Sequence, residues 1–131
     1  MMKNIYEVKT DKSFEDAVAA FKEAIEANNF SILFELDFKA TFAGYDIEFD
    51  KDYIIFDICD AKSAKAMLDE NLQIGYALPC KGVVYNDGKE VRIGAVKLAD
   101  NLADIDSSVV KKEAQDDQNR LQKAVDAAAA Q

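Results

Sequence analysis

The sequence lacks histidine entirely, and its 131 residues include only two cysteines and one proline. Without histidine the chain can form no Ser-His-Asp or Cys-His catalytic arrangement, and it has no imidazole ligand for zinc. Cys59 and Cys80 are too far apart in sequence for a C-x-x-C motif, and two thiolates alone cannot complete a four-cysteine metal site. We therefore expect no catalytic residue, no metal and no cofactor, and we expect both thiols to be free in a reducing compartment.

Long apolar runs and positive charge are also scarce. No apolar segment approaches the roughly 18 residues that a membrane helix needs, and the N-terminal residues lack the apolar core of a secretory signal. The chain has 16 basic and 25 acidic residues, a formal charge of -9 at pH 7. This charge repels nucleic-acid phosphates and anionic lipid headgroups. We expect a soluble, cytoplasmic protein that binds neither nucleic acid nor membrane.

In the first part of the chain, segments with the apolar period of a strand alternate with a segment that has the apolar period of a helix. Residues 5–8 have the two-residue period of a half-buried strand, and residues 13–28 have the three- and four-residue steps of a helix. Ser13 is expected to cap this helix and Asn28-Asn29 to end it. The next strand, residues 30–36, has one apolar face that we expect to pack against the helix, formed by Phe30, Ile32, Phe34 and Leu36.

An acidic segment separates this strand from the next. Asp37 is expected to cap a short helix over residues 38–43, which Gly44 ends. The alternating carboxylates of residues 45–52 resemble a calcium loop, but the central glycine and the closing acid are missing, so we predict an acidic loop or exposed edge. Residues 53–59, YIIFDIC, are apolar at successive positions, which predicts a central strand covered on both faces.

The second part of the chain is expected to contain two helices and a hairpin. Asp60 predicts the cap of a helix over residues 61–70, and Asp87-Gly88 predicts the turn between antiparallel strands 81–86 and 90–97. After an irregular segment with a helical turn, a last helix is expected from Ser107 or Ser108 to about Ala130. Its apolar stripe is narrow and is interrupted by Asp117.

The order of these segments resembles that of a known family. The quoted stretches are SFEDAVAAFKEAIEANNFSILFELDFKATF and YIIFDICDAKSAKAMLDENLQIGYALPCKGVVYNDGKEVRI, and the sharpest marks are Cys59, Gly75 and Leu78-Pro79-Cys80. From about Tyr6 to about Leu98 the chain resembles the DUF302 family of small bacterial and archaeal domains of unknown function. It departs from that family at Asn28-Asn29, where members usually have a glycine turn.

The resemblance implies an α+β fold in which a mainly antiparallel sheet is backed by helices on one face, of the TBP-like kind, with a C-terminal helix. It also implies a protein often found as a homodimer, and it implies no activity. We expect residues 1–106 to form the DUF302-like domain. Residues 107–131 are expected to form a helix that packs either on this domain or on a dimer mate.

The residues around the lone proline are the candidate ligand or redox site: Cys80, Cys59, Pro79 and Tyr76. Cys80 follows Pro79 at the start of a strand, where a thiol could face a pocket, and Lys81 could lower its pKa unless strand alternation directs the two side chains to opposite faces. Burial as a small apolar residue is the favoured explanation for each cysteine. Asp57, inside an apolar strand, needs a partner such as Arg92 or Lys97, or an edge position where water solvates it.

Two functions are consistent with these features. The first is a non-enzymatic module that binds a small molecule or a protein partner between sheet and helices, as a homodimer. The alternative is a thiol-based redox enzyme or sensor that uses Cys80 with or without Cys59. A cofactor carrier with cysteine ligation is a third hypothesis, which a colourless protein would contradict.

Overall fold

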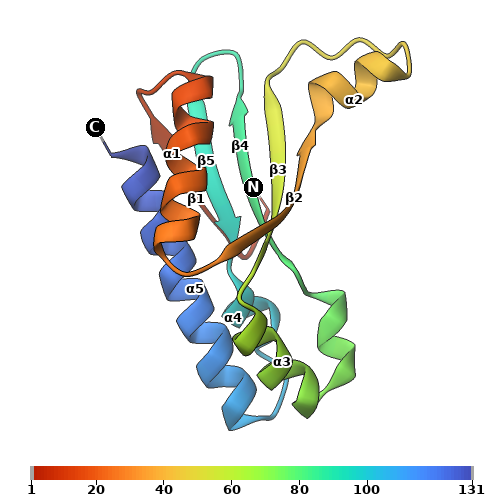
Figure 1. Ribbon diagram of the computed structural model, residues 1–131, viewed down its shortest axis with the longest axis vertical. Helices are drawn as coiled ribbons and strands as arrows, with labels where there is room; N and C mark the ends of the chain where they lie inside the picture. Colours follow the sequence, from red (N-terminus) through yellow and green to blue (C-terminus); the bar gives the residue numbers. More distant parts are fainter. Residues whose placement is uncertain (1, 131) are drawn as a thin grey trace.

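The computed structural model describes residues 2–130 and contains one five-stranded sheet with helices around it (Figure 1). All neighbouring strands are antiparallel, in the order β1-β5-β4-β3-β2. This confirms the predicted α+β class with a C-terminal helix. The elements in chain order are β1 Ile5–Thr10, α1 Phe14–Ala27, β2 Ser31–Asp37, α2 Phe38–Gly44, β3 Tyr53–Cys59, α3 Ala61–Glu70, the 3-10 helix η1 Leu72–Tyr76, β4 Cys80–Asn86, β5 Val91–Val96, α4 Leu98–Asn101 and α5 Ser108–Ala129.

Side-chain caps fix the starts of four helices at the predicted residues. In each case the side-chain oxygen accepts a hydrogen bond from a backbone N–H two or three residues further on. The capping residues are Ser13, Asp37, Asp60 and Ser107. Asn29, with φ of 67°, supplies the left-handed residue after α1. α2 ends at Gly44 as predicted, but Gly44 is not left-handed, and the left-handed residue after the helix is Asp46.

The core lies between one face of the sheet and the helices α1 and α5. Most residues of β3, β4 and β5 on this face are buried, and the ring of Phe21 from α1 meets the ring of Phe56 edge-on at 5.7 Å. We call this side the helix face. Its buried strand residues are Phe56, Ile58, Cys80, Val84, Val91, Ile93 and Ala95.

A β-bulge changes which residues of β2 face α1. The pairing with β3 shifts between Ile32 and Phe34, so Ile32 lies opposite Ile58 but Phe34 lies opposite Asp57. The extra residue reverses the alternation, and Phe34 and Leu36 therefore point to the side of the sheet away from α1. The predicted single apolar face is wrong for these two residues. Phe34 is 56% exposed.

The other side of the sheet, which we call the open face, has no covering helix along most of its area. In Figure 1, α1 and α5 lie on one side of the sheet, whereas α2 and η1 project on the other, near its two ends. β3 was expected to be covered on both faces, but Tyr53 and Ile55 on the open face are only half-buried. The strand residues of the open face are Ile5, Glu7, Lys9, Phe34, Leu36, Tyr53, Ile55, Asp57, Lys81, Val83, Tyr85, Arg92, Gly94 and Val96.

The C-terminal helix α5 packs against its own chain. It contacts α1, α3, α4, β5 and β1, and its apolar stripe is buried at Val110, Ala114, Leu121, Val125 and Ala128. Tyr6 Oη donates to Asp126 Oδ1 at 2.6 Å, and Thr10 Oγ1 donates to the Ala129 carbonyl at 2.9 Å, so α5 is also tied to β1. Between residues 2 and 130 no helix is both long enough and apolar enough to cross a membrane.

Candidate functional site

Three of the four candidate residues gather at one end of the sheet, where β3 ends and β4 begins. Cys80 lies opposite Ile58, the residue before Cys59, in the β3–β4 pairing, and it follows Pro79, whose peptide bond with Leu78 is cis. Cys80 is 3% exposed and belongs to the core. Both cysteines are free thiols, so the structure contains no bond between them.

The environment of the two thiols opposes their ionisation. Burial raises the pKa of Cys80 to about 12, with smaller contributions from the Asp117 carboxylate and the Cys59 thiol. Burial also raises the pKa of Cys59, and the carboxylates of Asp60 and Asp117 act in the same direction. Lys81 does not offset this effect, because its Nζ donates to Asp57 Oδ1 at 3.2 Å on the open face. Neither cysteine has the electropositive surroundings of a reactive thiol.

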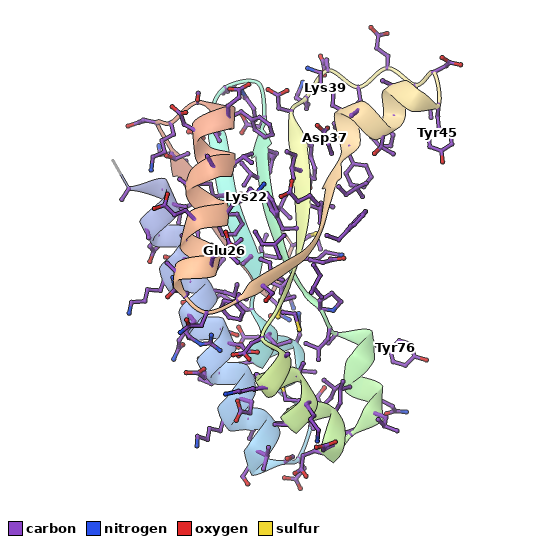
Figure 2. All side chains as sticks on the ribbon, viewed as in Figure 1. Lys22, Glu26, Asp37, Lys39, Tyr45 and Tyr76 are labelled. Atoms are coloured by element: carbon purple, nitrogen blue, oxygen red, sulfur yellow. The ribbon has the colours of Figure 1, made fainter. Side chains whose placement is uncertain are left out.

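The fourth candidate, Tyr76, lies apart from the thiols. It is the last residue of η1 and is 96% exposed, and its ring points away from the body of the molecule (Figure 2). Tyr85, in contrast, lies on the open face and its hydroxyl donates to Glu7 Oε2 at 2.8 Å. Burial and this hydrogen bond raise the pKa of Tyr85 to about 12. The expected grouping of Tyr76 with Cys80 in one pocket is not present among residues 2–130.

A buried polar cluster lies near the thiols and joins α5 to α3; it consists of Asp60, Ser63, Asp117 and Arg120. Asp117 accepts from Ser63 Oγ at 2.7 Å and from Arg120 Nη2 at 2.9 Å, and Arg120 Nη2 also donates to Asp60 Oδ2 at 2.7 Å. The Arg120 guanidinium lies 4.3 Å from the centre of the Phe30 ring. The signal for this cluster in the sequence was Asp117, which interrupts an apolar stripe. A carboxylate at such a position requires a partner once it is buried.

Asp60 and Asp117 have opposite pKa shifts within this cluster. Burial raises the pKa of Asp117 to about 6, and the Ser63 hydrogen bond and the Arg120 charge only partly offset that effect. Burial also tends to raise the pKa of Asp60, but hydrogen bonds from Arg120 and from the backbone of Ser63 and Lys62 lower it overall. The cluster therefore links α5 to the start of α3. Within it, the Asp117 carboxyl ionises less readily than an exposed aspartate.

The open face carries a continuous aromatic cluster at the end where α2 projects. Adjacent rings lie 5.1 to 6.5 Å apart, and Tyr53 and Tyr85 stack across β3 and β4 at 5.3 Å. Because aromatic pairs at these distances contribute beyond their buried area, they hold α2 and its following loop to the sheet. The members of the aromatic cluster are Phe38, Phe42, Phe49, Tyr53 and Tyr85.

The charged side chains of the open face are largely paired with one another. Asp57 pairs with Lys81, its direct cross-strand neighbour, and not with either of the predicted partners, Arg92 and Lys97. Arg92 lies 3.6 Å from Glu7 and also pairs with residues of the β4–β5 turn. The open face therefore presents apolar side chains between charges that are already neutralised.

Two hollows lie elsewhere on the surface. The larger, about 590 Å³, lies between the β1–α1 turn and the end of the β4–β5 hairpin, and its walls carry both signs of charge. The second, about 420 Å³, lies beside the edge strand β2 and is bordered by Lys22 and Glu26 of α1, labelled in Figure 2. Neither hollow is lined by Cys59, Pro79, Cys80 or Tyr76. Within residues 2–130 no group of three or more cysteine, aspartate or glutamate residues is placed to hold a metal ion.

The fold and these surfaces define a small α+β domain with one covered and one open sheet face. The chain belongs to the family described as "Domain of unknown function DUF302", whose model matches residues 6–128. This confirms the family resemblance, and the match extends through most of α5. The chain is also similar to the crystal structure of an uncharacterized conserved DUF302 protein from Bacillus stearothermophilus, with 24% identity and a TM-score of 0.87 over 98% of this chain and 100% of that one. No curated protein matches the chain.

Proposed function

We propose that this DUF302 domain is a non-catalytic module that binds a protein partner through the open face, and that in the homodimer this partner is a second copy. The observation that carries the proposal is the difference between the two faces of the sheet. Phe56, Ile58, Val84 and Ile93 on the helix face are fully buried, whereas Ile55 and Val83 in the middle of the open face are only half-buried. An apolar sheet face is stable when another layer covers it.

The sequence of β3 supports this interpretation. YIIFDIC has the composition of a strand that is covered on both faces, yet on the open face α2 and its loop cover only the Tyr53 end of β3. Covering Tyr53, Ile55 and Val83 with a second copy would account for their apolar character. Scattered apolar residues on a surface need no such explanation, but a contiguous set across two strands does.

The charge distribution favours self-association at this face. The whole chain has a formal charge of -9, so two copies repel each other on average. The strand residues of the open face, however, include three basic and two acidic side chains, namely Lys9, Lys81, Arg92, Glu7 and Asp57. Their sum is +1, so two open faces can approach without the repulsion that the rest of the surface would cause.

The burial of Cys80 argues against the alternative function. A thiol must be accessible and must ionise near neutral pH to act as a nucleophile or redox sensor. Cys80 is in the core with a pKa of about 12, and the pKa of Cys59 is also raised. A protein partner also suits the open face better than a small molecule, because the larger hollow lies elsewhere and the second reaches the open face only at Phe34 of the edge strand β2.

Sedimentation velocity tests the proposal with a matched pair of valine variants. We expect the native chain to sediment with twice the mass of one chain at tens of micromolar, and Val83→Lys to sediment as a folded monomer because the added charge is desolvated in the interface. Val109→Lys makes the same substitution at an exposed position of α5 and is expected to remain dimeric. A native chain that stays monomeric, or a Val83→Lys variant that dimerises like the native chain, would contradict the proposal.

A further inference from the structure

Two projections flank the open face, and both carry exposed apolar side chains at their ends. The first consists of α2 with the loop 45–52, where Tyr45 is 74% and Ile47 is 54% exposed. The second is η1, where Leu72 is 82% and Tyr76 is 96% exposed. In Figure 2 both tyrosines lie on the side of the sheet opposite α1 and α5, near its two ends. Exposed tyrosine side chains are typical of a surface that a partner covers.

We propose that the two copies of the homodimer are antiparallel about a twofold axis, an arrangement that we call head to tail, so that the α2 projection of each contacts η1 of the other. Tyr45 and Ile47 of one copy then pack against Leu72 and Tyr76 of its partner. This inference rests on the proposed homodimer and specifies which surfaces complete it. In a twofold interface every such contact occurs twice, once from the first copy to the second and once from the second copy to the first.

The size of the sheet indicates that the projections take part in the interface. Five strands of six or seven residues cover about 24 by 22 Å, which is about 500 Å². A stable interface usually buries about 800 Å² on each partner. The flat footprint of the strands is smaller than this area, and the two projections, which adjoin it on the same side, extend it with large exposed apolar residues.

The charges of the projections select the head-to-tail arrangement. The loop 45–52 carries four acidic residues and one lysine, namely Asp46, Glu48, Asp50, Asp52 and Lys51. If the two copies met with their α2 projections together, these carboxylates would repel each other. The η1 sequence LQIGY has no charged residue, so the α2 projection of the other copy meets apolar side chains there without that repulsion.

Cysteine cross-linking with a short bismaleimide tests the arrangement. In a Cys59→Ser background, where the remaining Cys80 is buried, Tyr45→Cys and Tyr76→Cys replace exposed residues and are expected to leave the fold intact. We expect an equimolar mixture of the two variants to give covalent dimers, and Tyr45→Cys alone to give about tenfold less. Val109→Cys, exposed on α5 outside the open face and its projections, is the matched control and is expected to give none.

A second measurement separates this inference from the homodimer on which it rests. Tyr45→Asp and Tyr76→Asp are each expected to raise the dimer dissociation constant about tenfold or more, as the loss of a central aromatic contact does. Efficient cross-linking of Tyr45→Cys alone, or unchanged dissociation constants in both aspartate variants, would overturn the head-to-tail arrangement while leaving a dimer in place. A native chain that sediments as a monomer would overturn both proposals.

Discussion

Asp117 shows at the scale of one residue how burial and hydrogen bonding together decide a pKa. Its carboxylate is 3% exposed and accepts hydrogen bonds from Ser63 and Arg120, yet its pKa is raised to about 6. In the unfolded chain the pKa of an aspartate is about 3.9. Between these two values the folded chain binds the proton more tightly, so stability from this residue is present at low pH and decreases as pH rises from about 4 to 6.

The variant Asp117→Asn is predicted to remove this pH dependence. The difference of about two pKa units corresponds to about 3 kcal/mol, so native stability should fall relative to the variant by up to that amount between pH 4 and pH 7. Urea unfolding followed by circular dichroism at several pH values measures the difference. The lowered pKa of Asp60 changes the stability with the opposite sign and only below about pH 4. It therefore does not contribute to the change in stability between pH 4 and pH 7.

The matched control is Asp116→Asn, which removes another carboxylate that pairs with Arg120, at 2.9 Å but on the exposed side of α5. It is expected to keep the native pH dependence. If the native protein and Asp117→Asn show parallel stability curves from pH 4 to pH 7, the carboxyl group of Asp117 does not have the raised pKa described above.

At the scale of elements, the close approach of α1 to the sheet depends on Gly82. A Cβ atom at this position would lie 2.8 Å from both Ile58 Cδ1 and Phe21 Cε2. Gly82→Ala is therefore predicted to destabilise the fold by about 1 to 3 kcal/mol, because the ring of Phe21 has no room to move in a packed core. Chemical denaturation gives the value directly.

Gly75→Ala provides the comparison for this substitution. The nearest atom to a Cβ at Gly75 is Leu68 Cδ2 at 3.9 Å, which is an ordinary contact distance. This variant is expected to have native stability or slightly more, since alanine restricts the unfolded chain. Equal stability of the two alanine variants would mean that α1 does not approach β4 as closely as described.

The elements also show which features of the fold could be predicted from sequence. Caps and turns were predictable because Ser13, Asp60 and Ser107 act on backbone groups only a few residues away. The bulge in β2 was not, because its cause is the pairing with β3 and no residue near Leu33 indicates an extra position. The apolar composition of β3 predicted cover on both faces, and the single chain provides it on one.

The candidate site was predicted less well than the fold for a related reason. Proximity in sequence suggested that Tyr76 and Cys80 share a pocket, but η1 carries Tyr76 outward while Cys80 enters the core. The polar cluster joins Asp60 and Ser63 to residues more than fifty positions later, and no periodicity identifies such partners. Asp117 indicated only that a partner must exist.

At the scale of the whole molecule, the net charge and the open face make opposite contributions to self-association. Two copies that each have a formal charge of -9 repel at long range, and salt screens that repulsion within about 10 Å at 0.1 M. The apolar contacts of the open face do not weaken with salt. Pairs such as Asp57–Lys81 lie within one chain, so they do not hold the two copies together.

The proposed homodimer is therefore predicted to tighten as salt increases. Between low salt and about 0.5 M sodium chloride the dissociation constant should fall about threefold, as repulsion of this size is screened. Sedimentation equilibrium at several protein concentrations measures it, with Val109→Lys as a control that lowers the net negative charge away from the interface and should show a smaller salt effect. A dissociation constant that rises with salt would indicate that ion pairs between the copies, and not apolar contacts of the open face, hold the dimer together.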